Sequence, residues 1–171
     1  MTEQQWDKKL KIHTCGRDDF HSDEYHYPYE PTPYTVLERL VESEYITSDN
    51  VVIDYGCGKG FAIAEQNKNT SHSSNISFLC KNAEEYEIST ADSFYFFNPF
   101  SVEILRSVLG KIIDSYYENP REMKLFFYYP NDEYLSELMT RNELMFLDEI
   151  DCHDLFEGNN ERERILIFEI I

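Results

Sequence analysis

VVIDYGCGKG, residues 51–60, is the stretch that decides the fold of this chain. Apolar, mostly β-branched residues end at Asp54 and break into a glycine-rich turn, which is typical of a buried parallel strand that runs into a ligand-binding loop. Gly56 permits a tight turn, Gly58 lets backbone N–H groups approach a ligand, and Gly60 leaves room for a helix to pack on the strand. The stretch therefore predicts a strand, a binding turn and the start of a helix.

Helix and strand signals alternate on both sides of this stretch. Upstream, apolar residues at helical spacing predict a helix over 33–44, which begins at Pro33 after a capping Thr32. Downstream, short apolar runs bounded by turn residues predict strands, and longer runs at helical spacing predict helices. The predicted strands are 76–80, 93–97, 124–129, 143–150 and 164–171, and the predicted helices are 61–68, 101–118 and 131–139, with a short helical turn near 81–86.

This order of elements predicts an α/β fold, in which helices flank a mostly parallel sheet. Only a polar loop separates the last two strands, so we expect them to form a C-terminal antiparallel hairpin. The length fits a single domain over residues 1–171. Residues 1–28 are polar and aromatic without a sustained period, and we expect this N-terminal arm to pack on the domain as irregular structure or a short helix.

The charge of the chain excludes several classes of partner. Lys and Arg total 15 against 33 Asp and Glu, and the net charge of -18 opposes sequence-independent binding to a nucleic-acid backbone. No apolar run approaches the roughly 20 residues of a membrane span, and the N-terminal residues contain no apolar signal core. We therefore expect a cytoplasmic protein that binds neither bulk nucleic acid nor a membrane.

The cysteines and histidines do not form a recognisable metal or disulfide pattern. The four cysteines are Cys15, Cys57, Cys80 and Cys152. They contain no CxxC pair, so reduced thiols are the simplest interpretation. His13 with Cys15, and His21 with His26, are possible metal ligands near the N-terminus. Because further ligands at a recognisable spacing are missing, we expect no metal site.

Gly56, Gly58 and Gly60 alternate as GxGxG, and with the preceding strand they resemble the first motif of class I S-adenosylmethionine-dependent methyltransferases. The resemblance runs from about residue 29 to the C-terminus and implies a Rossmann-like fold with S-adenosylmethionine as the cofactor. It places Asp54 near the methionine amino group, and Gly56, Cys57 and Gly58, with Gly60 in the same turn, along the cofactor. A redox enzyme that binds NAD would more usually carry GxGxxG.

Further parts of the resemblance lie outside the glycine turn. An acid-alanine pair often follows the third strand of these enzymes, and here Asn82, Ala83 and Glu84 occupy that place, which implies contacts to the adenine ring. Upstream, Tyr29 and Thr32 stand where related enzymes close the amino-acid end of the cofactor. The alternative for Thr32 is that it only caps the following helix.

Asn98-Pro99-Phe100 follows the fourth strand of the resemblance, where amino-group methyltransferases carry Asn or Asp, two prolines, and Tyr or Phe. An Asn carbonyl can accept a hydrogen bond from a target amine, while a proline carbonyl and an aromatic ring fix the plane of that amine. The resemblance implies Asn98 as a catalytic or orienting residue, with Pro99 and Phe100 as substrate contacts. Only one proline is present, which leaves the alternative that Asn98 simply ends its strand.

The chain departs from these enzymes between Gly60 and the strand predicted at 76–80. Residues 61–75 leave room for one crossover helix, whereas a full βαβ step takes about 30 residues. The second strand and the acid that binds the ribose hydroxyls have no counterpart, because Glu65 falls on the predicted helix. Two functions are therefore considered: a methyltransferase for a protein or small-molecule acceptor, whose target group is an amine, carboxylate or hydroxyl, and a non-catalytic Rossmann-like interaction module with a vestigial cofactor pocket.

Overall fold

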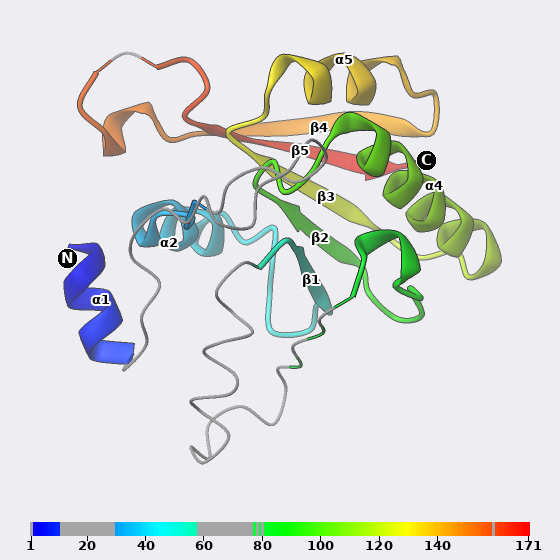
Figure 1. Cartoon of the computed structure of the whole chain (residues 1–171), viewed down its shortest axis with the longest axis horizontal. Coiled ribbons are helices and arrows are strands. Elements are labelled where there is room, and N and C mark those ends of the chain that lie inside the picture. Colours follow the sequence, from blue (N-terminus) through cyan, green and yellow to red (C-terminus); the bar gives the residue numbers. More distant parts are fainter. Residues whose placement is uncertain (1, 11–29, 58–76, 78, 80, 159) are drawn as a thin grey trace.

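A computed structural model of the chain describes residues 2–10, 30–57, 77, 79, 81–158 and 160–171. In this part of the chain, five strands form one sheet in the order β1-β2-β3-β5-β4 (Figure 1). The strands are β1 (Val52–Tyr55), β2 (Ser93–Phe96), β3 (Lys124–Tyr128), β4 (Leu144–Asp151) and β5 (Arg164–Ile170). β1, β2 and β3 run parallel, and β5 runs antiparallel to both β3 and β4. The sheet is thus parallel over its first strands and ends in the antiparallel hairpin that the sequence predicts.

Helices cover both faces of this sheet. They are α1 (Glu3–Leu10), α2 (Tyr34–Glu42), α4 (Val102–Glu118) and α5 (Asp132–Thr140), with short 3-10 turns η1 (Ala83–Glu85) and η2 (His153–Leu155). The apolar residues of α4 and α5 share one core with one face of the sheet, and those of α2 share a second core with the other face. The α/β class is therefore confirmed. Within the described ranges, no helix is both long and apolar enough to cross a membrane.

Side-chain alternation along the strands assigns residues to the two cores. On β2, Phe94 and Phe96 face α4, whereas Tyr95 faces α2. Asp54 is the register partner of Tyr95 in the neighbouring strand, and paired residues of a parallel ladder point to the same face of the sheet. The carboxyl group of Asp54 therefore lies on the α2 side, near the end of its strand.

The predicted helix signals at the last two helices are confirmed. α4 carries Leu105, Leu109 and Ile112 at helical spacing, and all three are fully buried. α5 begins after Asn131, whose side-chain oxygen accepts a 2.8 Å hydrogen bond from the backbone N–H of Tyr134. This bond satisfies one of the donors that a helix N-terminus leaves without a partner.

The start of the N-terminal arm forms α1 and contacts the start of α2. The rings of Trp6 and Tyr34 stack with their centroids 5.5 Å apart, and the Tyr34 hydroxyl donates to Asp7 Oδ1 at 3.1 Å. Residues 11–29, and with them Tyr29, lie outside the described residues.

Three sequence predictions differ from the structure or fall on residues it does not describe. Thr32 does not cap α2, because the helix begins at Tyr34 after Pro33 and has no side-chain capping bond; that prediction was wrong. Of the strand predicted at 76–80, the two described residues, Ser77 and Leu79, are not in a strand. The helix predicted at 61–68 lies outside the described residues.

Candidate functional site

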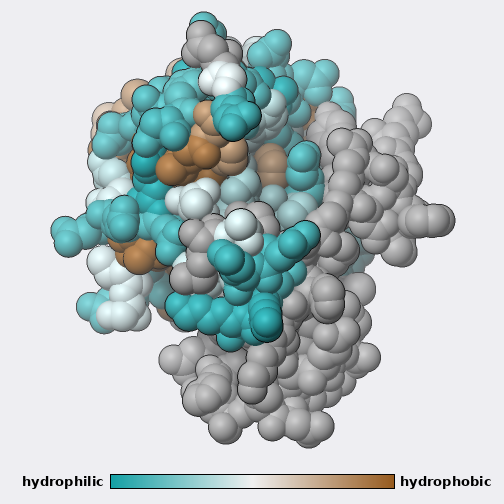
Figure 2. All heavy atoms as spheres, turned by 90° about the vertical axis from the view of Figure 1, so that its left-hand side faces the viewer, coloured by the Kyte–Doolittle hydropathy of each residue, from teal (hydrophilic) through white to brown (hydrophobic). Residues whose placement is uncertain are grey.

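The three parallel strands end together on the side of the molecule that carries α2 (Figure 1). Open α/β sheets bind ligands at the carboxyl ends of parallel strands. Gly56 directly follows β1, Tyr129 directly follows β3, and Asn98 lies two residues beyond the end of β2. Figure 2 shows this side of the molecule, where hydrophilic residues cover most of the coloured surface and small hydrophobic areas lie between them. This edge of the sheet is the candidate site.

Asp54 is the most distinctive charged group at this edge. Its side chain keeps an exposed surface, yet the surrounding protein still desolvates the carboxylate and raises its pKa to about 6. No hydrogen bond or opposite charge among the described residues offsets this desolvation. A carboxylate held in this way is suited to receive a cationic group from a ligand.

Thr32 lies beside the register partner of Asp54. Its hydroxyl is 3.0 Å from the hydroxyl of Tyr95, which is buried in β2. Burial raises the pKa of Tyr95 well above its usual value, the hydrogen bond with Thr32 lowers it in part, and the charge of Asp54 raises it. Because the phenol stays neutral, the Thr32–Tyr95 pair is an uncharged hydrogen-bonding group next to an acid. The structure thus places Thr32 at the candidate site, and its contact with a cofactor stays a prediction.

Gly56 makes the turn after β1 in a conformation that favours glycine. Its φ is +81°, and a Cβ atom at this position would lie 2.3 Å from Cβ of Pro99. The tight turn predicted for Gly56 is confirmed, and the close approach brings the turns after β1 and β2 into direct contact. Cys57 follows Gly56 and is half-buried. Gly58 and Gly60 lie outside the described residues.

Asn98 joins the ends of β2 and β3 through its side-chain amide. Its φ is +40°, in the left-handed region that Asn tolerates better than most residues. Nδ2 donates to the carbonyl oxygen of Tyr129 at 2.7 Å, and Oδ1 accepts from the backbone N–H of Asn131 at 3.2 Å. Both ends of the amide are therefore used within the protein, which is the strand-ending role named above as the alternative.

Phe100 is buried in the core on the α4 side rather than exposed at the strand ends. Its ring lies 6.4 Å from that of Tyr55 and 6.3 Å from that of Phe96, and its side chain is only 4% exposed. Its backbone carbonyl accepts a 2.6 Å hydrogen bond from the buried hydroxyl of Tyr134. Pro99, which is half-buried and touches Gly56, is the part of the predicted substrate motif nearest to the cofactor turn.

Asn82, Ala83 and Glu84 lie in and before η1, which packs against α4. The Asn82 amide donates to Oε1 of Glu85 at 3.2 Å, and both Asn82 and Glu84 are exposed. These contacts join neighbouring residues in and before η1 or link η1 to α4, and none of them involves Asp54. A role at the adenine ring stays a prediction.

Sequence analysis missed Tyr129 and Arg162, which meet beside Asn98. The guanidinium of Arg162 lies 4.2 Å from the centre of the Tyr129 ring and donates from Nη2 to the Tyr129 carbonyl oxygen at 3.1 Å. Asn160 Nδ2 donates to the Tyr129 hydroxyl at 2.6 Å. Arg162 stands in a charged run of the sequence, and no local signal marks it.

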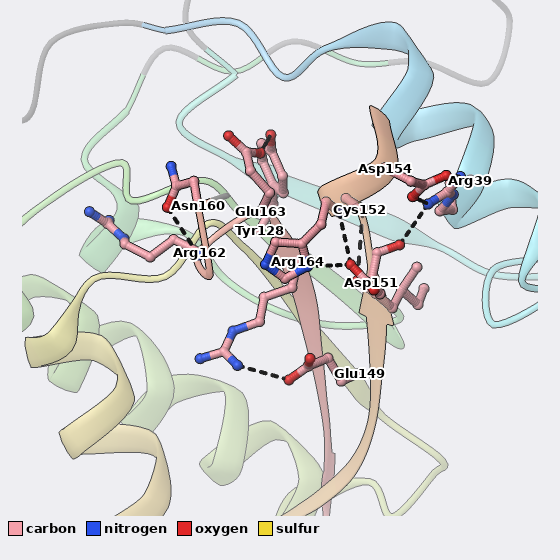
Figure 3. A network of polar contacts seen from close by, with 12 residues as sticks. Arg39, Tyr128, Glu149, Asp151, Cys152, Asp154, Asn160, Arg162, Glu163 and Arg164 are labelled. Carbon is pink, nitrogen blue, oxygen red and sulfur yellow. Dashed lines mark hydrogen bonds and ion pairs between the residues drawn. The ribbon is translucent and has the colours of Figure 1, made fainter. Parts of the chain in front are cut away.

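The connection between β4 and β5 is tied to its surroundings by a polar network (Figure 3). Arg39 of α2 donates to the Asp151 carbonyl oxygen and to Oδ2 of Asp154, each at 2.8 Å, and this ion pair holds the pKa of Asp154 below its usual range. The Tyr128 hydroxyl donates to Glu163 Oε2 at 2.7 Å. These contacts fix the connection against α2 and the end of β3.

No trio of His, Cys, Asp or Glu side chains in the described part of the chain is arranged to hold a metal ion. The predicted possible ligands near the N-terminus, from His13 to His26, lie outside the described residues.

Comparison with known proteins adds one short match. No family model matches the chain. A protein-lysine N-methyltransferase from Saccharolobus islandicus (strain REY15A) is 46% identical over 35 residues, which are 20% of this chain and 22% of that protein. The match thus spans about a fifth of the length of the relative.

Proposed function

We propose that this protein is an S-adenosylmethionine-dependent methyltransferase with a Rossmann-like fold. The observation that carries the proposal is Asp54, a desolvated carboxylate without a described partner, at the end of β1 and beside the Gly56 turn. Such a group fits the α-ammonium of an amino-acid ligand, because a charge-assisted hydrogen bond would offset the desolvation of both charges.

The strand order supports the proposal independently of Asp54. In the doubly wound order 3-2-1-4-5-6, the first strand lies next to the fourth, and the fourth lies next to the fifth. β1, β2 and β3 lie side by side in this way when β2 and β3 are taken as the fourth and fifth strands. The short match to a methyltransferase points to the same class of enzyme.

The residues of the chain fit the amino-acid end of the cofactor. We assign Asp54 to its ammonium group, the backbone of Gly56 and Cys57 to its methionyl and ribose parts, and the Thr32 hydroxyl to a polar contact beside Asp54. When bound, S-adenosylmethionine would supply an activated methyl group. The protein would contribute by holding the acceptor in line with that group, and such orientation can supply much of the rate enhancement without a protein nucleophile.

The acceptor that we propose is an amine, specifically a lysine side chain of another protein. The relative that shares the short match is a protein-lysine N-methyltransferase. The net charge of -18 would attract a cationic acceptor and repel nucleic acid. Because both ends of the Asn98 amide already bond the backbone, we assign Asn98 to fixing the Pro99 turn, where the acceptor would lie.

Isothermal titration calorimetry of the intact protein at pH 7.5 with S-adenosylhomocysteine, the reaction product, tests the proposal. We expect binding by the wild type and an affinity about 10 to 100 times lower for Asp54→Asn, because hydrogen bonds to charged groups contribute about 1.5–3 kcal/mol. Asp49→Asn is the matched control, since Asp49 lies in an exposed turn before the other end of β1.

Two results would overturn the proposal. If the wild type does not bind S-adenosylhomocysteine, the non-catalytic interaction module becomes the better interpretation. If the wild type binds NAD and not S-adenosylhomocysteine in the same kind of titration, an NAD-dependent oxidoreductase becomes the better interpretation.

A further inference from the structure

Tyr129 adopts a backbone conformation that requires support. Its φ is +51°, and bulky residues rarely occupy the left-handed region because the Cβ atom crowds the backbone there. Strain of this kind persists only where surrounding contacts impose it, and it concentrates at ligand sites. Tyr129 directly follows β3 at the candidate site, so the contacts that hold it there bear on the shape of the site.

Asn98 and Arg162 hold the Tyr129 carbonyl from two sides. Asn98 Nδ2 donates to this oxygen at 2.7 Å, and Arg162 Nη2 donates to it at 3.1 Å. Arg162 Nε also donates to the carbonyl of Pro130 at 3.2 Å, and its guanidinium covers the Tyr129 ring at 4.2 Å. A planar guanidinium can donate to both carbonyls at once, and we call this pair of hydrogen bonds from Nε and Nη2 the Arg162 fork. An ammonium group cannot form it.

Arg162 has no ion-pair partner in the described part of the chain, although acidic residues outnumber basic ones by about two to one in the sequence. Among the described residues, no carboxylate lies within ion-pair distance of it, whereas Arg164 pairs with Oε2 of Glu149 at 3.1 Å. Figure 3 shows the Arg162 side chain pointing away from the other labelled residues of the network. Its donors are directed to the backbone after β3.

The contacts that hold Tyr129 continue to the Gly56 turn, which we assign to cofactor binding. Arg162 and Asn98 share the Tyr129 carbonyl, Asn98 precedes Pro99, and Pro99 lies against Gly56 so closely that no Cβ fits between them. One continuous set of contacts therefore links the β4–β5 connection to the ends of all three parallel strands.

We propose that Arg162 is a positioning residue for cofactor binding: it holds the turn after β3, and through Asn98 and Pro99 it holds the Gly56 turn in its binding conformation. This inference rests on the proposed function. A preorganised turn binds more tightly because less order has to be gained in the complex. Loss of the fork therefore lowers affinity even though Arg162 does not contact Asp54.

Calorimetric titration of S-adenosylhomocysteine into the wild type, Arg162→Ala, Arg162→Lys and Arg164→Ala tests the inference. We expect both Arg162 variants to bind about tenfold more weakly than the wild type, because lysine keeps the charge but not the fork. Arg164→Ala has the same change in charge and should bind as the wild type does. Circular dichroism and the melting temperature show which variants are folded, and Arg162→Lys serves if Arg162→Ala does not fold.

The outcomes separate this inference from the proposed function. If the wild type binds and Arg162→Ala binds equally well, with or without a lower melting temperature, Arg162 is only structural and the inference fails while the proposed function stands. If Arg162→Lys binds like the wild type, charge and not geometry is responsible, and the inference fails as well. If the wild type itself does not bind, the proposed function fails and takes the inference with it.

Discussion

Asp54→Asn should stabilise the folded protein at neutral pH while it weakens cofactor binding. The pKa of Asp54 rises from 3.8 to about 6 on folding, because the protein desolvates the carboxylate and no described group compensates. At about 1.4 kcal/mol for each pKa unit, this difference sets a ceiling of about 3 kcal/mol on the penalty of keeping the group ionised. The side chain is exposed, and solvent screening reduces the expected gain to about 1 kcal/mol.

The sign of the pH dependence follows from the direction of this pKa change. Because the folded state binds the Asp54 proton more tightly than the unfolded state, the contribution of this group to stability is largest below pH 3.8 and is lost as pH rises to about 6. Asparagine does not titrate. The advantage of Asp54→Asn over the wild type should therefore be about half of its full value at pH 5 and reach its full value by pH 7.5.

Urea unfolding of both proteins, followed by circular dichroism at pH 5, 6, 7 and 8, measures this advantage. A gain of about 1 kcal/mol corresponds to a melting temperature roughly 2–4 °C higher for a domain of this size. Asp49→Asn, for which no such gain is expected, controls for the change in net charge. The reasoning is refuted if Asp54→Asn is less stable than the wild type at pH 8, or if its advantage is the same at pH 5 and pH 8.

Further predictions concern the turns at the strand ends, and urea unfolding measures each of them. Gly56→Ala should destabilise the protein by about 1–3 kcal/mol, because it combines positive φ with a clash against Cβ of Pro99, whereas Gly110→Ala, in open space on α4, should be neutral or stabilise by about 0.5–1 kcal/mol. Asn98→Ala should cost about 1–3 kcal/mol, because the Asn131 N–H loses its acceptor and the Tyr129 carbonyl loses one of its two donors, while the exposed Asn82→Ala should change little; equal effects would contradict the described contacts. Asn131→Ala should cost about 1 kcal/mol through loss of its cap, and an unchanged midpoint would contradict the capping role.

The parts of the fold that the sequence predicted are those governed by local patterns. The helix at α4 follows from apolar spacing, the start of α5 from the capping residue Asn131, and the antiparallel hairpin from two strands joined by a polar loop. Asp54 and Gly56 were predicted as site residues for the same reason, because an acid near the end of an apolar strand is followed by a glycine turn.

Contacts between distant segments could not be predicted in this way. Arg162 reaches Tyr129 only because β5 pairs antiparallel with β3, which brings the start of β5 to the end of β3. Thr32 precedes a proline and a helix, which is a capping pattern, but its hydroxyl bonds Tyr95 far along the chain instead. In both cases tertiary packing decides between partners that local sequence does not distinguish.

A crystal structure of the protein in complex with S-adenosylhomocysteine tests the central claim most directly. The account predicts that the ligand lies at the ends of β1 and β2, with its ammonium group within hydrogen-bonding distance of the Asp54 carboxylate and its amino-acid end beside Thr32. A ligand bound elsewhere, or one whose ammonium group has no contact with Asp54, would contradict the account.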